Sequence, residues 1–125
     1  MNPATTKTLY RPVGQAELDL IAAADWQRFP PRLEWQPIFY PVLTEEYAIF
    51  IAEKWNTKDP NSGYVGYVLQ FEIDADYIAQ FTIQNVGGPE SLEYWIPAEE
   101  LETFNDKIVG EIEVTHQFAK DELTK

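Results

Sequence analysis

The chain has 125 residues with no cysteine and one histidine, which excludes a disulfide framework, a thiol nucleophile and a multi-histidine metal site. Hydrophobic residues make up 45% of the chain and aromatic residues 14%, enough apolar area for one folded domain without a structural metal. Nine basic and 21 acidic residues give a formal net charge of −12, which argues against nonspecific nucleic-acid binding.

Acidic residues are concentrated in the second half of the chain. Residues 63–125 hold 13 acidic and three basic residues, whereas residues 1–62 hold eight and six. The acidic half is either a solvated face or a patch that docks a basic protein partner. No apolar run is long enough to span a membrane, and the N-terminus lacks the apolar core of a signal peptide. We therefore expect a cytoplasmic protein that does not contact a membrane.

The first half of the chain predicts strands at 8–13 and 38–40 and helices at 15–26 and 44–55. In both helices, apolar residues recur at the spacing of one helical face. Thr44 is a suitable N-cap for the second helix, because its hydroxyl can accept a hydrogen bond from a backbone N–H of the first turn. Prolines bracket the second strand, which favours a short strand or a strand at a sheet edge.

Strands dominate the second half, where apolar and polar residues alternate with period two. An aspartate at 74 or 76 is a suitable cap for one helical turn. The predicted elements are strands at 64–73, 81–86, 92–96 and 110–118, a helical turn at 77–80 and a short acidic helix at 98–105. The alternation in the last strand predicts one shared apolar face for Ile112, Val114, His116 and Phe118.

This order of elements predicts an α+β fold, because the strands cluster late and do not alternate regularly with helices. We expect a single domain over residues 1–125, with a mostly antiparallel sheet and two main helices. The ordered core is predicted at about 8–118, with flexible ends outside it.

The common catalytic signatures are missing from the sequence: a phosphate-binding P-loop, a dinucleotide-binding glycine motif and a nucleophilic serine elbow. The spacing of a calcium-binding loop is also missing, so we expect no metal cofactor. His116 is in phase with the apolar residues of the last predicted strand. This phase indicates a packed or strand-edge histidine and not a catalytic base.

Three positions combine a polar group with neighbouring aromatic residues: Arg11 after Tyr10, Tyr40 after Phe39, and Glu93 two residues before Trp95. Alternation places Glu93 on the opposite face of its strand from the apolar residues beside it. Two interpretations stay open for Arg11 and Glu93. They project into a cleft, or they lie on the solvent side of the sheet.

The order of five short motifs resembles the ADP-ribosyltransferase fold, and the chain is similar to small uncharacterised bacterial proteins labelled ADP-ribosylation/crystallin. The resemblance spans about residues 8–118. It implies a split, mostly antiparallel sheet that clamps NAD. The motifs are LYR at 9–11, IFY at 38–40, TEEYA at 44–48, VLQFEI at 68–73 and EYWIP at 93–97.

The resemblance also implies roles for the three singled-out residues. Arg11 would bind the ribose or phosphate of NAD, and Tyr40 would line the nicotinamide pocket. Glu93 would be the catalytic residue, because a carboxylate on a ribose hydroxyl stabilises the oxocarbenium character that develops when nicotinamide leaves. Arg28 and Arg32 either add to a diphosphate site or are surface arginines.

The sequence also departs from the pattern of that family. The segment after Tyr40 lacks the Ser-Thr-Ser type of motif, and the overall acidity opposes a dianionic ligand. Three hypotheses follow. The protein is an NAD-dependent ADP-ribosyltransferase-like enzyme, or a non-catalytic module that binds a nucleotide or a basic protein partner, or a cytoplasmic structural domain without a ligand. The sequence specifies neither the acceptor substrate nor the oligomeric state.

Overall fold

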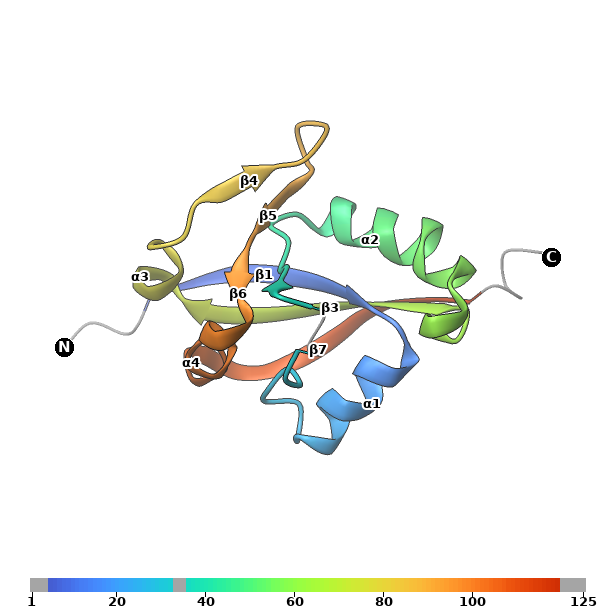
Figure 1. Ribbon diagram of the computed structural model, residues 1–125, viewed down its shortest axis with the longest axis horizontal. Helices are drawn as coiled ribbons and strands as arrows, with labels where there is room; N and C mark the ends of the chain where they lie inside the picture. Colours follow the sequence, from blue (N-terminus) through green and yellow to red (C-terminus); the bar gives the residue numbers. More distant parts are fainter. Residues whose placement is uncertain (1–4, 33–35, 120–125) are drawn as a thin grey trace.

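A computed structural model describes residues 5–32 and 36–119 as a small α+β domain with antiparallel sheets (Figure 1). In the central sheet, β3 (Val65–Asp74) lies between β1 (Thr6–Val13) and β7 (Ile108–Ala119). A hairpin pairs β4 (Ile83–Asn85) with β5 (Leu92–Tyr94), and β2 (Ile38–Phe39) pairs with β6 (Ile96–Pro97). The described helices are α1 (Gln15–Ala23), α2 (Glu45–Lys54), α3 (Ala75–Ile78) and α4 (Leu101–Asp106), with 3₁₀ turns at Asn56–Lys58, Pro60–Ser62 and Ala98–Glu100.

Residues 41–43 join the central sheet to the β4–β5 hairpin. The backbones of Tyr10 and Val42 exchange two hydrogen bonds, of 2.9 and 2.8 Å. On the other side, the Leu43 N–H donates to the Leu92 carbonyl at 3.0 Å. The segment therefore sits between β1 and β5 as a short bridging strand. This places the chain just before it, which carries Tyr40, next to the ends of both strands.

Helix α2 covers one face of the central sheet, and α1 and α4 cover the other (Figure 1). Under α2, Ala48 and Ala52 pack on Val42 and Val68. The helix backbone approaches the sheet so closely that a Cβ on Gly66 would overlap the Ala52 carbonyl group. Both faces of β3 are therefore buried from Gly66 to Leu69, whereas Gln70 and Glu72 further along the strand are half-buried.

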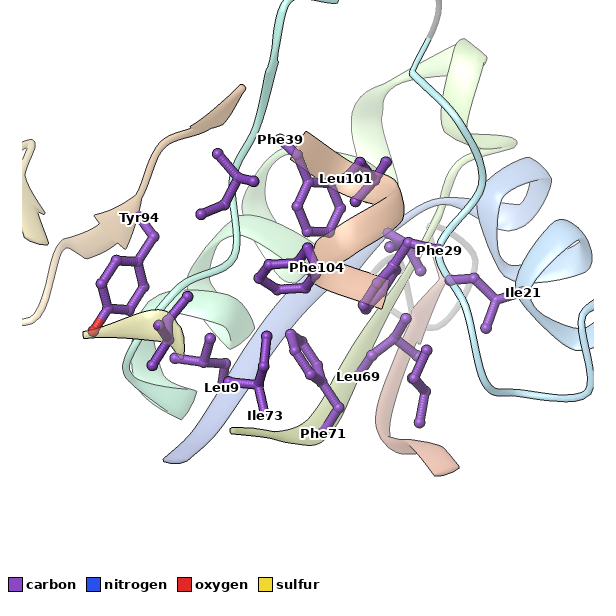
Figure 2. Close-up of a cluster of buried hydrophobic side chains, with 14 of the residues drawn as sticks. Leu9, Ile21, Phe29, Phe39, Leu69, Phe71, Ile73, Tyr94, Leu101 and Phe104 are labelled. Carbon is purple, nitrogen blue, oxygen red and sulfur yellow. The ribbon is translucent and has the colours of Figure 1, made fainter. Parts of the chain in front are cut away.

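Four phenylalanine rings form the centre of the main core (Figure 2). The ring of Phe29 lies 5.0 Å from those of Phe39 and Phe71, centre to centre, and Phe39 lies 5.3 Å from Phe104. The rings meet edge-on or tilted, which is the favoured geometry for aromatic pairs. They come from the loop after α1, from β2, from β3 and from α4. The cluster therefore fixes the position of β2, which lies just before the bridging segment in the chain.

Helix α1 ends at Ala23, three residues before the predicted end at Trp26. Asp25 and Trp26 have φ angles of 59° and 62°, so the chain leaves the helix through two consecutive left-handed residues. The Trp26 carbonyl then accepts a hydrogen bond from the Ile112 N–H at 2.7 Å. The left-handed turn, closed by a hydrogen bond of 3.0 Å from the Trp26 N–H to the Ile21 carbonyl, therefore ends this helix before the prolines do.

The predicted shared face of the last strand is wrong, because His116 and Phe118 lie on the opposite face of β7 from Ile112 and Val114. In the pairing of β3 with β7, Val68 faces His116 but Leu69 faces Val114, so Thr115 is an extra residue in the ladder. A bulge of this kind shifts the side-chain alternation by one position, so His116 and Phe118 face α2. Val114 stays on the face of Ile112 and is 42% exposed. Ile112 is buried as expected.

The predicted helix caps at Thr44 and at an aspartate near 74 are both formed. The Thr44 hydroxyl accepts from the Tyr47 N–H at 3.2 Å, and Asp74 caps α3 by accepting from the Tyr77 N–H at 2.9 Å. The expected strand at 92–96 is divided between β5 and β6 at Trp95.

The ordered strands extend beyond the predicted core limits of 8 and 118, since Thr6 and Ala119 end described strands. The rest of the predicted flexible ends, residues 1–4 and 120–125, lies outside the described residues. None of the described helices is both long enough and apolar enough to cross a membrane.

Candidate functional site

The three predicted site residues line one cavity of about 470 Å³, although they come from segments far apart in the sequence. Arg11 lies near the end of β1, Tyr40 directly follows β2, and Glu93 is the central residue of β5. We call this space the Glu93 cavity. Its lining residues are Arg11, Pro12, Tyr40, Val42, Ile51, Glu93 and Trp95.

Burial separates the two interpretations that the sequence left open for Arg11 and Glu93. Arg11 is 8% exposed and Glu93 is 9% exposed, so neither lies on the solvent side of a sheet. Arg11 shares the buried face of β1 with Leu9 and Val13, whereas Glu93 contacts Tyr47 of the helix on the opposite face. The side chains of Arg11 and Glu93 line the same cavity because only the short bridging segment lies between β1 and β5.

The guanidinium group of Arg11 is held on three sides. Its Nε donates to Glu17 Oε2 at 2.6 Å and its Nη2 donates to Glu17 Oε1 at 2.9 Å. Its Nη1 donates to the Tyr40 carbonyl at 3.3 Å, and its Cζ lies 4.5 Å from the centre of the Phe39 ring. The two-pronged pair with Glu17 is the strong form of this interaction. An anionic ligand at Arg11 therefore has to displace Glu17 or bind beside it.

Tyr40 and Trp95 form an aromatic pair beside the cavity. Their ring centres are 6.4 Å apart, and the rings are nearly perpendicular, at 86°. Tyr40 is 40% exposed and Trp95 is 43% exposed, so each ring presents apolar area to solvent. Half-exposed aromatic rings next to buried charges are suited to packing against a planar ligand group.

Two donors hold the Glu93 carboxylate. Trp95 Nε1 donates to Oε1 at 2.7 Å, and the Tyr47 hydroxyl donates to Oε2 at 3.3 Å. Burial, together with the charge of Glu93, raises the pKa of Tyr47, so this hydroxyl keeps its proton at neutral pH. Each carboxylate oxygen has capacity for a further hydrogen bond, which a ligand hydroxyl in the cavity can donate.

A second cavity, of about 580 Å³, is also lined by Arg11. We call it the Arg32 cavity. Arg11 and Pro12 line both cavities. The Arg32 cavity is lined by Arg11, Pro12, Val13, Gly14, Ala16, Glu17, Leu20, Pro30, Pro31, Arg32, Gln36, Asn56 and Ser62.

Arg32 differs from the other arginines in having no hydrogen-bond partner within the described residues, and its Nε is buried. The Cζ of Arg32 lies 5.7 Å from the centre of the Phe39 ring. The guanidinium group of Arg11 lies against the same ring. Burial and the nearby Arg11 charge lower the pKa of Arg32, while Glu17 opposes that shift. Arg28 instead pairs with Asp106 at 3.0 Å on the surface. Of the two candidate arginines, only Arg32 therefore lines a cavity together with Arg11.

His116 lies away from both cavities, 4.0 Å from Glu45. Its ring stands 6.3 Å from that of Phe118, in agreement with the prediction of a packed histidine. Within residues 5–32 and 36–119, no group of three or more histidine, aspartate or glutamate side chains is placed to hold a metal ion.

Sequence reasoning missed Glu17 and Tyr47, which hold Arg11 and Glu93. A partial signal existed for Glu17, an acidic residue in the first turn of the helix that follows the Arg11 strand. Tyr47 had the spacing of a core residue of α2, and nothing in its sequence neighbourhood indicates a bond to Glu93.

Comparison of the chain with known proteins gives no match: no protein family, no curated protein and no solved structure is significantly similar to it. Its chemistry is therefore inferred from the two cavities.

Proposed function

We propose that the protein binds NAD in the Glu93 cavity and acts as an ADP-ribosyltransferase-like enzyme. The observation that supports this proposal most strongly is the convergence of Arg11, Tyr40 and Glu93 on one cavity. The chemical character of the cavity also suits two parts of NAD. The nicotinamide ring is planar and cationic, whereas the diphosphate is anionic.

The nicotinamide end matches the aromatic pair and the carboxylate. A cationic ring is attracted both to the faces of Tyr40 and Trp95 and to the Glu93 carboxylate. Glu93 is already oriented by Trp95 and Tyr47, so it needs little reorganisation when a ligand enters. Donors and acceptors oriented in advance are the usual source of transition-state stabilisation.

The proposed reaction breaks the bond between C1′ of the ribose and the nicotinamide nitrogen. Nicotinamide leaves with the electron pair of that bond, and positive charge develops over C1′ and the ring oxygen of the ribose. Glu93 stabilises this charge and accepts a hydrogen bond from a ribose hydroxyl. A nucleophilic group of the acceptor then bonds to C1′ and loses its proton to solvent.

A second candidate function is ligand binding without cleavage. It is favoured by the ion pair of Arg11 with Glu17, because both prongs of the guanidinium fork are occupied. In this alternative the cavity binds a nucleotide weakly and serves as a sensor or docking site.

The two candidates are separated by measuring NAD binding calorimetrically and nicotinamide release chromatographically on the same samples. We expect saturable NAD binding by the native chain and slow nicotinamide release. Glu93→Gln keeps the shape of the side chain and one acceptor oxygen for Trp95 Nε1, while its amide N–H group can donate to the Tyr47 hydroxyl. This variant should bind NAD but release nicotinamide about 10²- to 10³-fold more slowly.

Glu113→Gln is the matched control, since Glu113 is an exposed glutamate of β7 outside both cavities. It should behave as the native chain does. Binding without release in the native protein would support the non-catalytic candidate. Absence of NAD binding at millimolar concentration would contradict both the transferase proposal and an NAD-sensing role.

A further inference from the structure

We infer that the Arg32 cavity binds a phosphate group, and that Glu17 occupies part of this anion site when it is empty. The inference concerns a cavity that Arg11 lines and Glu93 does not. It does not depend on NAD cleavage, and it applies to any ligand that carries an exposed phosphate or diphosphate.

The net charge of the residues that line this cavity is opposite in sign to the net charge of the whole chain. Its charged lining residues are Arg11, Arg32 and Glu17, so the lining carries one net positive charge in a protein of net charge −12. Two of the three arginines of the sequence are gathered here. A local positive site in an acidic protein attracts anions that the rest of the surface repels.

Arg32 has a buried N–H group, at Nε, without a hydrogen-bond acceptor among the described residues. Burial lowers the pKa of Arg32, and like-charge repulsion from the nearby Arg11 lowers it further. An arginine stays charged in proteins, so a desolvated guanidinium beside a second one is stabilised by an anion that contacts both.

Glu17 offsets the charge of Arg11 and not that of Arg32. Both of its carboxylate oxygens accept from Arg11, at 2.6 and 2.9 Å. A bound phosphate would bring one more negative charge to the remaining N–H groups of Arg11 and to Arg32. Glu17 therefore competes with the ligand for Arg11, and its removal should strengthen anion binding.

The backbone beside the two arginines adds further donors. Helix α1 begins at this cavity, and its N-cap residue, Gly14, provides no side-chain cap. The N–H groups of a helix's first turn have no partner inside the helix and favour an anion. Gly14 also approaches Ser62 so closely that a Cβ would lie 2.5 Å from the Ser62 Cβ, so a larger residue cannot occupy this position without a shift.

Phosphate fits this site better than a carboxylate does. A carboxylate has two oxygens and resembles Glu17, which is already present. A phosphate group has at least three acceptor oxygens, enough to bind Arg32, the free N–H groups of Arg11 and a backbone N–H at once. The structure thus favours a tetrahedral anion.

The test is a calorimetric titration of the full chain with inorganic pyrophosphate and, separately, with inorganic phosphate at constant ionic strength. We expect saturable binding of at least one of the two. Arg32→Gln should weaken it by about ten-fold or more, the amount expected for one charge-assisted hydrogen bond. Glu17→Gln should strengthen it, and Arg32→Lys should fall between the native chain and Arg32→Gln.

Arg28→Gln is the matched control, because Arg28 is a surface arginine that does not line the cavity. It should leave the affinity unchanged, and thermal melts of each variant verify folding. Equal losses in Arg28→Gln and Arg32→Gln would overturn the inference, as would absence of saturable binding by the native chain. Pyrophosphate binding without NAD binding would support this site while contradicting the proposed function. NAD binding by a native chain that shows no saturable binding of phosphate or pyrophosphate would do the reverse.

Discussion

The Tyr47 hydroxyl donates a hydrogen bond of 3.3 Å to the Glu93 carboxylate, linking α2 to β5 across the cavity wall. The two residues are 46 positions apart, and the bond exists because the bridging segment brings β5 beneath α2. It orients Glu93 from the face of the sheet opposite Arg11. The helix therefore contributes to the position of the proposed catalytic carboxylate without touching Arg11.

This bond predicts a change in the titration of Tyr47. In Glu93→Gln the negative charge is lost, so the pKa of Tyr47 should fall toward its ordinary value of 10.0. It should remain above that value, because burial is the largest cause of the shift and persists in the variant. The measurement is a pH titration of the tyrosine ring carbons by NMR. Glu45→Gln is the control, since it should lower the pKa of Tyr10 and leave Tyr47 unchanged.

Tyr77 predicts a loss of stability in alkaline solution. Burial and a 2.8 Å hydrogen bond to Glu100 raise the pKa of Tyr77 well above its ordinary value. Above about pH 10 the unfolded chain releases this proton while the folded chain retains it, so the free energy of unfolding falls as the pH rises.

Urea denaturation between about pH 8 and pH 11 measures this slope. Tyr77→Phe should reduce the slope and leave a remainder due to Tyr10 and Tyr47, whose pKa values are also raised. An unchanged slope in Tyr77→Phe would show that the hydroxyl of Tyr77 does not titrate as described.

The contact of α2 with the sheet predicts that Gly66→Ala is destabilising. The added methyl would meet the backbone of Ala52, which cannot rotate away as a side chain can. We expect the free energy of unfolding to fall by about 1–3 kcal/mol. Gly88→Ala is the control, because no described atom lies within 4 Å of the methyl it would add. Equal stability of the two variants by urea denaturation would contradict this close packing.

The ion pair of Arg11 with Glu17 predicts a stability change that a ligand reverses. Glu17→Gln leaves the buried Arg11 without its carboxylate, and the free energy of unfolding should fall by about 1–3 kcal/mol. Because pyrophosphate binds only the folded chain, it should raise the melting temperature of this variant more than that of the native protein. Thermal melts with and without pyrophosphate measure both effects. Asp19→Asn, on the same helix and outside both cavities, provides the comparison.

Local signals in the sequence predicted much of the fold. Thr44 and Asp74 cap their helices because capping depends on residues within one turn. The long alternation of β3 predicted a strand, since side-chain periodicity is a property of the strand itself. The order of the short motifs also led to Arg11, Tyr40 and Glu93, which the structure brings to one cavity.

Features that depend on partners distant in sequence were not predictable in the same way. The placement of His116 and Phe118 on the α2 face depends on the register of β7 against β3, which the extra residue at Thr115 shifts. Tyr47 bonds to Glu93, 46 positions away, only because the bridging segment brings β5 beneath α2. No spacing rule in a single sequence encodes these pairings.

The ring of Phe39 contacts both the hydrophobic core and the arginines that line the two cavities. One ring contacts Phe29 and Phe104 and also lies within 6 Å of the guanidinium groups of Arg11 and Arg32. A substitution there loosens the aromatic cluster and removes a negative ring face from two cations at once. Variation at this position is therefore doubly constrained. Any replacement that preserves packing volume without an aromatic face should fold less stably and also change how strongly the protein attracts anions.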